Sequence, residues 1–187
     1  MEPVRNDPQL GPLVEEHGNL SIGTADDEFE RLIVAIVNQQ LSVDSAAAIR
    51  ERLFDRVDVS PAGVLAADES TLRDVGLSGQ KVEYVRNVAE AFQDRDLTRA
   101  GLADESDEEV VEVLTDIRGV GVWTAKMYLV FVLGRPDVFP VEDLGVRKGM
   151  AHLYGYDEGD RAGMREHAER WRPYRSHASR YLWRAVD

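Results

Sequence analysis

The sequence contains no cysteine among its 187 residues. This absence excludes disulfide bonds, thiol nucleophiles, cysteine-ligated zinc and iron–sulfur clusters held by cysteine. No apolar run approaches the ~18 residues that a membrane-spanning helix needs, and no apolar signal core follows the N-terminal residues. We therefore expect a soluble, cytoplasmic protein with no membrane partner.

Lysine is scarce, because only three of the 22 basic residues are lysine: Lys81, Lys126 and Lys148. The 35 acidic residues give a formal net charge of −13. An acid-rich, lysine-poor surface is typical of proteins that work at very high salt, so we interpret the chain as halophilic, with an ordinary acidic protein as the alternative. Net acidity by itself argues against a nucleic-acid partner. Residues 131–187, however, hold ten basic and nine acidic residues, a net of +1.

Strand-like alternation of apolar and polar residues is not found over any useful length, whereas helical spacing recurs along the chain. We expect helices over 29–37, 46–57, 61–65, 82–92, 107–117, 123–133, 143–154, 161–171 and 175–186. The fold class is therefore all-α. Residues 1–25 are rich in proline and glycine, which predicts an irregular N-terminal arm ahead of a core over 26–187 without a clean internal boundary.

A Gly-x-Gly turn, Gly119-Val120-Gly121, lies between two expected helices. Glycine permits a tight turn and lets another backbone approach closely. The helix that follows leaves N–H groups without partners at its start, and such groups bind phosphate. The apolar flanks favour a helix–hairpin–helix element, although a Gly-x-Gly turn also joins helices that bind nothing.

Two adjacent carboxylates, Glu142 and Asp143, precede an expected helix, and Asp143 follows Trp123 by twenty residues. The simplest interpretation makes Asp143 the N-cap of that helix, which stabilises a helix by about 1 kcal/mol. A carboxylate can also stabilise positive charge that develops in a reaction. The residue pattern leaves both interpretations open, with Glu142 as a cap or surface residue.

Together these two segments resemble the signature of the helix–hairpin–helix (HhH-GPD) DNA glycosylase superfamily, and in particular its 3-methyladenine DNA glycosylase II branch. Three further stretches carry the resemblance: Ile36–Ser42, Gly134–Pro140 and Glu169–Arg184. The resemblance covers about residues 26–187. It implies two helical lobes around a DNA-binding cleft. It also implies a monofunctional N-glycosylase of base excision repair. Such an enzyme flips alkylated purines, such as 3-methyladenine and 7-methylguanine, out of double-stranded DNA and hydrolyses their N-glycosidic bonds.

Two other functions stay open at this point: removal of oxidised or mismatched bases, and a non-catalytic hairpin module that only binds DNA. Bifunctional relatives carry a nucleophilic lysine where this chain has Trp123, and tryptophan cannot form a Schiff base. This difference favours hydrolysis without a lyase step. Bacterial relatives also carry an additional N-terminal domain, which leaves the substrate range open.

The resemblance implies roles for individual residues. Asp143 matches the catalytic aspartate, which would stabilise positive charge on the deoxyribose. Trp123 and Trp183 would line the pocket for the flipped base, where cation–π attraction favours a cationic purine. Gln40 and Leu41 are rival candidates for the wedge that enters the vacated base stack.

The hairpin N–H groups around Gly119 and Gly121 would bind a DNA phosphate. Further phosphate contacts are implied, with surface ion pairs as the alternative, for Arg147, Lys148, Arg172 and Arg175. A sodium or potassium ion would bridge hairpin carbonyls to the phosphate, and the matching carbonyls belong to Thr115, Ile117 and Val120. We expect no required cofactor and no iron–sulfur cluster. One DNA site per chain favours a monomer.

Overall fold

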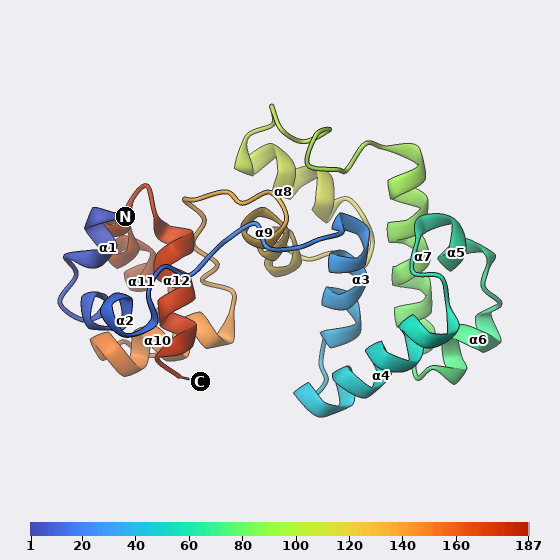
Figure 1. The fold of residues 1–187 in the computed structure, drawn as a ribbon, viewed down its shortest axis with the longest axis horizontal. Helices are drawn as coiled ribbons and strands as arrows, with labels where there is room; N and C mark the ends of the chain where they lie inside the picture. Colours follow the sequence, from blue (N-terminus) through green and yellow to red (C-terminus); the bar gives the residue numbers. More distant parts are fainter. Residues whose placement is uncertain (187) are drawn as a thin grey trace. The chain divides into compact units, whose positions relative to one another are not determined.

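The computed structural model describes residues 1–186, apart from the side chain of Val43. All regular structure in this part of the chain is helical, which confirms the all-α prediction (Figure 1). The chain divides into two compact units. Unit 1 comprises Met1–Thr24 and Leu129–Asp187, and unit 2 comprises Ala25–Tyr128. Within residues 1–186, no helix is both long and apolar enough to cross a membrane.

Most helices of unit 2 have starts that are fixed by side-chain caps. Its helices are α3 (Glu28–Asn38), α4 (Val43–Arg56), α5 (Pro61–Ala66), α6 (Glu69–Asp74), α7 (Gly79–Asp94) and α8 (Asp107–Thr115). Serine precedes four of them and accepts a hydrogen bond from a first-turn N–H: Ser42, Ser60, Ser78 and Ser106. Such caps satisfy donors that a helix start otherwise leaves without partners.

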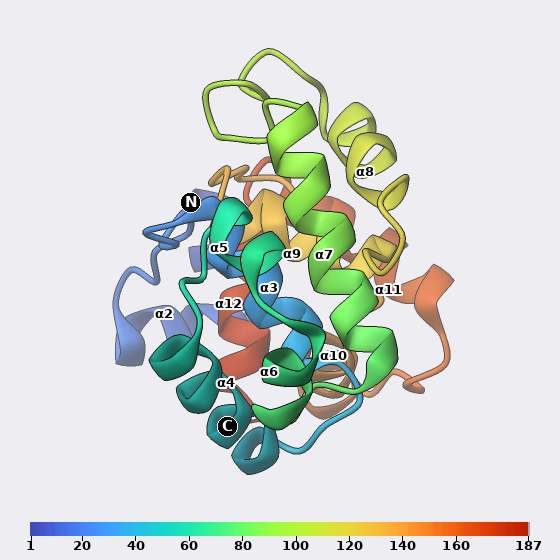
Figure 2. The ribbon, with the colours of Figure 1, turned by 90° about the vertical axis from the view of Figure 1, so that its right-hand side faces the viewer.

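The core of unit 2 forms where α7 packs against α3, α5 and α6, and Figure 2 shows α7 with the two shorter helices beside it. The apolar stripe of α3 is buried at Phe29, Leu32, Ile33 and Ile36, as its spacing predicts. Phe29 meets Phe92 of α7 edge to face, with ring centroids 5.3 Å apart. This contact joins the start of α3 to the end of α7.

Unit 1 contains the helices from both ends of the described chain (Figure 1). They are α1 (Glu2–Arg5), α2 (Leu10–His17), α10 (Leu144–Tyr154), α11 (Arg161–Ala168), the 3-10 helix η1 (Glu169–Trp171) and α12 (Arg175–Arg184). Helices α10 and α12 pack closely because Gly149 has no side chain. A Cβ at Gly149 would lie 2.4 Å from the carbonyl oxygen of Leu182.

The prediction of an irregular N-terminal arm is wrong, because residues 2–5 and 10–17 are helical. Pro3 and Pro12 lie in the first turns of α1 and α2, where proline removes no helical hydrogen bond. Val4 and Leu10 are fully buried in the core of unit 1. The N-terminal segment is therefore part of the structure of unit 1.

The chain divides after Thr24 and after Tyr128, so unit 1 takes residues from both sides of unit 2. The second division falls inside helix α9 (Val122–Phe131). A boundary within a continuous helix leaves no proline-rich or glycine-rich linker in the sequence. Composition therefore cannot indicate it.

Candidate functional site

Asp143 is the N-cap of α10 and is held at one oxygen by two donors. Its Oδ1 accepts a hydrogen bond from the backbone N–H of Val146 at 2.9 Å. The same oxygen accepts the indole N–H of Trp183 at 2.7 Å. The N-cap interpretation is therefore confirmed, and the structure adds a tryptophan contact that fixes the direction of the carboxylate.

Trp183 reaches Asp143 from the last turns of α12, and Gly145 makes room for it. A Cβ at Gly145 would lie 2.7 Å from Cδ1 of Trp183 and 3.1 Å from Oδ1 of Asp143. Phe131 stacks on the indole at a centroid distance of 5.7 Å and an interplanar angle of 22°, and the Arg180 guanidinium carbon lies 6.0 Å from the Trp183 ring centroid. The Arg180 guanidinium carbon lies 5.3 Å from the Phe131 centroid. Unit 1 thus places a carboxylate beside an aromatic stack.

The loop that leads to Asp143 is clamped by the start of α12. Ser176 Oγ donates to the Arg135 carbonyl at 2.6 Å and accepts the Val138 N–H at 2.9 Å. The Ser176 N–H donates to the Pro136 carbonyl at 3.0 Å. These three bonds fix residues 135–138, and through them they fix where the chain enters α10.

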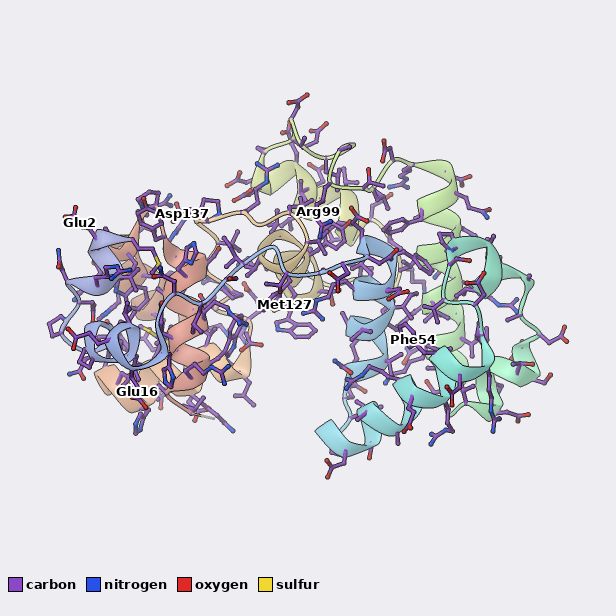
Figure 3. The ribbon with its side chains drawn as sticks, viewed as in Figure 1. Glu2, Glu16, Phe54, Arg99, Met127 and Asp137 are labelled. Atoms are coloured by element: carbon purple, nitrogen blue, oxygen red, sulfur yellow. The ribbon has the colours of Figure 1, made fainter. Side chains whose placement is uncertain are left out.

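Asp137, which is labelled in Figure 3, completes this clamp as the acceptor for two arginines. Arg175 Nε lies 2.8 Å from Asp137 Oδ1, and Arg172 Nη1 lies 2.7 Å from Oδ2. Both arginines also pair with Glu169, at 2.8 and 2.6 Å. Arg172 and Arg175 are predicted to contact phosphate, with surface ion pairs as the alternative. The structure shows the ion pairs, because carboxylates of the same unit pair with both guanidinium groups.

The other predicted phosphate contacts lie on α10. Lys148 is exposed and projects from the helix that Asp143 caps. Arg147 is half-buried, and its Nη1 donates to the Glu158 carbonyl at 3.3 Å. Glu142 lies apart from these contacts and pairs with Arg165 at 3.3 Å. Lys148 is therefore the better placed of the two for a phosphate.

The hairpin between α8 and α9 lies in unit 2 and depends on a glycine with positive φ. Gly119 has φ 107°, and a Cβ there would lie 2.4 Å from Cγ of Tyr84. Its carbonyl accepts the side-chain amide of Gln39 at 3.0 Å. The neighbouring Arg118 carbonyl accepts the side-chain amide of Asn87 at 3.1 Å. The hairpin is thus fixed by groups on α7 and at the end of α3.

A cavity of about 570 Å³ in unit 2 brings the predicted wedge residues next to the hairpin. Gln40 and Leu41 line this cavity together with Gly119 and Gly121. Gln40 is exposed and has φ 57°, the left-handed region that residues other than glycine rarely adopt. Leu41 is 39% exposed, unusual for a large apolar side chain. The remaining pocket candidate, Trp123, lies in the first turn of α9.

The hairpin carbonyls fit a monovalent cation in one respect. The Ile117 carbonyl accepts the Val120 N–H at 3.0 Å, which leaves its second lone pair for another partner. Within residues 1–186, the carbonyls of Thr115 and Val120 accept none of the backbone hydrogen bonds outside helices. Three such oxygens are ligands of the hard, oxygen type that sodium and potassium take. Separately, no cluster of three or more His, Asp or Glu side chains suits a metal ion in this part of the chain.

Sequence reasoning missed several residues of these sites. The sequence pattern contains Asp137 and Ser176 only within the longer stretches Gly134–Pro140 and Glu169–Arg184, and it does not single out Gly145. Lys81, whose Nζ donates to the carbonyls of Val37 and Gln39, stands out in the sequence only as one of three lysines. Its position three residues after the N-cap Ser78 was the available signal, since that places it in the first turn of a helix beside the cavity.

Comparison with known proteins identifies relatives along most of the chain. The profile of the HhH-GPD superfamily base excision DNA repair proteins matches residues 33–173. DNA-3-methyladenine glycosylase 1 of Schizosaccharomyces pombe is 33% identical over 84% of this chain and 72% of its own length. The Bacillus subtilis protein YfjP is 29% identical over 95% of this chain, which spans 66% of that relative.

A solved structure shares the fold. It is the 3-methyladenine DNA glycosylase Mag1 of S. pombe in complex with abasic DNA, with a TM-score of 0.87 and 30% identity. The similarity covers 98% of this chain and 94% of that one. The N-terminal helix α2 therefore falls within the part of the chain that is similar.

Proposed function

Because the chain belongs to the HhH-GPD superfamily of base excision DNA repair proteins, we propose that it is a monofunctional DNA N-glycosylase. Its substrate is double-stranded DNA that carries alkylated purines of the 3-methyladenine and 7-methylguanine type. The observation that supports this proposal most directly is the contact between Asp143 and Trp183. A carboxylate with a fixed direction, beside an aromatic face, suits a flipped cationic base and the sugar attached to it.

Asp143 is the proposed catalytic residue. Cleavage of the N-glycosidic bond develops oxocarbenium character on the deoxyribose, and a carboxylate near C1′ stabilises that charge and orients the attacking water. Preorganisation matters because an oriented charge needs no rearrangement as the reaction proceeds. The two donors on Oδ1 supply that orientation.

Trp183 of unit 1 is the proposed stacking partner of the flipped base, and Trp123 of unit 2 is the second aromatic residue that the resemblance assigns to base binding. Stacking of a cationic purine on an indole contributes about 0.5–2 kcal/mol. An alkylated cationic purine is also a good leaving group, so the reaction needs no strong general acid. Trp123 provides no amine for a Schiff base, and the products are therefore the free base and an intact strand with an abasic site.

The proposed DNA contacts lie around the hairpin and on α10. The N–H groups near Gly119 and Gly121 bind a phosphate, and a sodium or potassium ion on the carbonyls of Thr115, Ile117 and Val120 would add a positive charge there. Gln40 or Leu41 fills the space that the flipped base leaves. We further propose that the enzyme acts as a monomer in the cytoplasm.

The test is base release from methylated duplex DNA, with the wild type compared with Asp143→Asn. Asparagine caps a helix as well as aspartate does, so the fold of α10 should be kept. We expect the single-turnover rate to fall at least about a hundredfold while binding of abasic DNA persists. Glu142→Gln is the matched control, because it removes the neighbouring carboxylate, and it should keep the wild-type rate.

The assay is run at low and at molar potassium chloride, since the halophilic interpretation predicts that activity rises with salt. If Asp143→Asn excised bases at the wild-type rate, the catalytic assignment would be overturned. No release of alkylated bases at any salt concentration would overturn the proposed substrate. A panel of oxidised and mismatched bases would then separate another glycosylase of the superfamily from a module that only binds DNA.

A further inference from the structure

The turn after α3 is held by a lysine from another helix. Lys81, in the first turn of α7, donates from Nζ to the carbonyls of Val37 at 2.6 Å and Gln39 at 2.8 Å. Helix ends leave such carbonyls without partners and carry partial negative charge, so an ammonium group is favourable there. Lys81 is partly buried, and burial lowers the pKa of its ammonium group below the ordinary value.

The same turn is tied to the hairpin on its other side. The Gln39 side-chain amide donates to the Gly119 carbonyl at 3.0 Å. Tyr84, which packs on Gly119 and leaves no room for a side chain there, comes from α7 like Lys81. One helix therefore supports both the turn and the hairpin.

These bonds explain how Gln40 stays in an unfavourable conformation. A residue other than glycine in the left-handed region costs on the order of 1 kcal/mol, and it persists only where its surroundings fix it. Gln40 directly follows Gln39. The side-chain amide of Gln39 donates a hydrogen bond to the hairpin, and its carbonyl is one of the two that Lys81 binds. Leu41, the next residue, remains exposed.

We propose that Lys81 is a positioning residue that presets the Gln39–Leu41 turn, hereafter the wedge turn, before DNA arrives. This inference rests on the proposed function. A wedge that had to be ordered on binding would lose conformational entropy during base flipping, whereas a preset wedge loses little. Lys81 therefore acts on the flipping step through the turn and makes no contact with the reacting atoms.

The test compares Lys81→Met, which keeps the apolar stem and removes the donors, with Lys81→Arg, which keeps a charged donor. Single-turnover release of 7-methylguanine is measured on two duplexes. In one, the lesion is paired with cytosine; in the other, it lies opposite a stable abasic-site analogue, which leaves it unpaired and easier to flip. We expect Lys81→Met to lose about tenfold on the paired lesion and less than about twofold on the unpaired one, with Lys81→Arg close to the wild type on both.

Gln39→Met provides a second variant, which removes only the bond to the hairpin, and it should show the same selective loss. Arg56→Met is the matched control, because it removes an exposed cation at the end of α4 and should leave both rates unchanged. Equal losses on the two duplexes, or no loss on the paired one, would overturn the positioning role. A wild type that releases no alkylated base from either duplex would instead contradict the proposed function.

Discussion

Two tryptophans of unit 1 make the same chemical contact with different consequences. Trp183 donates its indole N–H to Asp143 at 2.7 Å, and Trp171 donates to Asp7 at 2.9 Å. Trp171 is fully buried in the core, where Asp7 is also buried. Trp183 is only partly buried and lies beside the proposed catalytic residue. The first contact therefore governs the geometry of a site, and the second governs stability.

Phenylalanine substitutions separate these two roles. Trp183→Phe keeps an aromatic ring but removes the donor, so we expect the excision rate to fall about tenfold with little change in the unfolding free energy. Trp171→Phe leaves a buried carboxylate short of a donor, which should lower the unfolding free energy by about 2 kcal/mol. Single-turnover excision and urea unfolding measure the two effects. Equal behaviour of the two variants in both assays would contradict the assignment.

At the scale of elements, the segment before and at the start of α12 is a clamp for the loop that leads to Asp143. Ser176 holds the backbone of that loop, and Arg172 and Arg175 hold Asp137. The resemblance implied that both arginines contact phosphate. Their carboxylate partners within unit 1 show that both arginines hold the loop, and contact with phosphate stays a prediction.

Glutamine substitutions on α10 and α12 test this division. Arg175→Gln should lower the unfolding free energy by about 1–3 kcal/mol, because Arg175 is mostly buried in its ion pairs and its loss leaves Asp137 short of donors. Lys148→Gln should leave stability unchanged and weaken DNA binding. It should also reduce the slope of log affinity against log salt by about 0.9, the value for one phosphate contact. A shallower salt dependence for Arg175→Gln than for Lys148→Gln would reverse the two roles.

The longer helices could be predicted because their apolar spacing reflects burial directly. Residues 29–37 are an example, since α3 covers Glu28–Asn38. Helices α1, α2 and α6 were missed because they are short and depend on distant contacts, such as the bond between Asp7 and Trp171 across 164 positions. The cap role of Asp143 was readable locally. Its contact with Trp183, forty residues away, required the fold.

At the scale of the whole molecule, two buried groups of unit 1 make the protein sensitive to acid. His167 lies among Tyr154, Tyr156 and Trp171, and burial, together with the charge of Arg170, lowers its pKa below the ordinary value. For Asp7, burial raises the pKa, but hydrogen bonds from Tyr154, Trp171 and two backbone N–H groups outweigh it and leave the pKa lowered. Both groups therefore bind protons more readily in the unfolded chain.

Folded-state pKa values that lie below the unfolded ones give stability that is present at neutral pH and lost as the pH falls. His167 contributes first, below about pH 6.5, and Asp7 contributes below about pH 4. We expect the unfolding free energy to decrease from pH 7 to pH 5, and His167→Phe to flatten that decrease. His152→Gln removes an exposed histidine and should keep the wild-type slope. Urea unfolding at a series of pH values measures this dependence. An unchanged slope of unfolding free energy against pH in His167→Phe would contradict the assignment.

Unit 1 is discontinuous in sequence, since its first helices precede unit 2 and the rest follow it. On the ribosome, α1 and α2 emerge early and must wait for partners such as Trp171 until nearly the whole chain has been made. Asp143 emerges before Trp183 as well, so a chain that stops short of α12 lacks both the clamp and the indole that orients the carboxylate. Premature termination or loss of the last helix would therefore leave the hairpin of unit 2 in the chain but remove the contact that orients the proposed catalytic carboxylate.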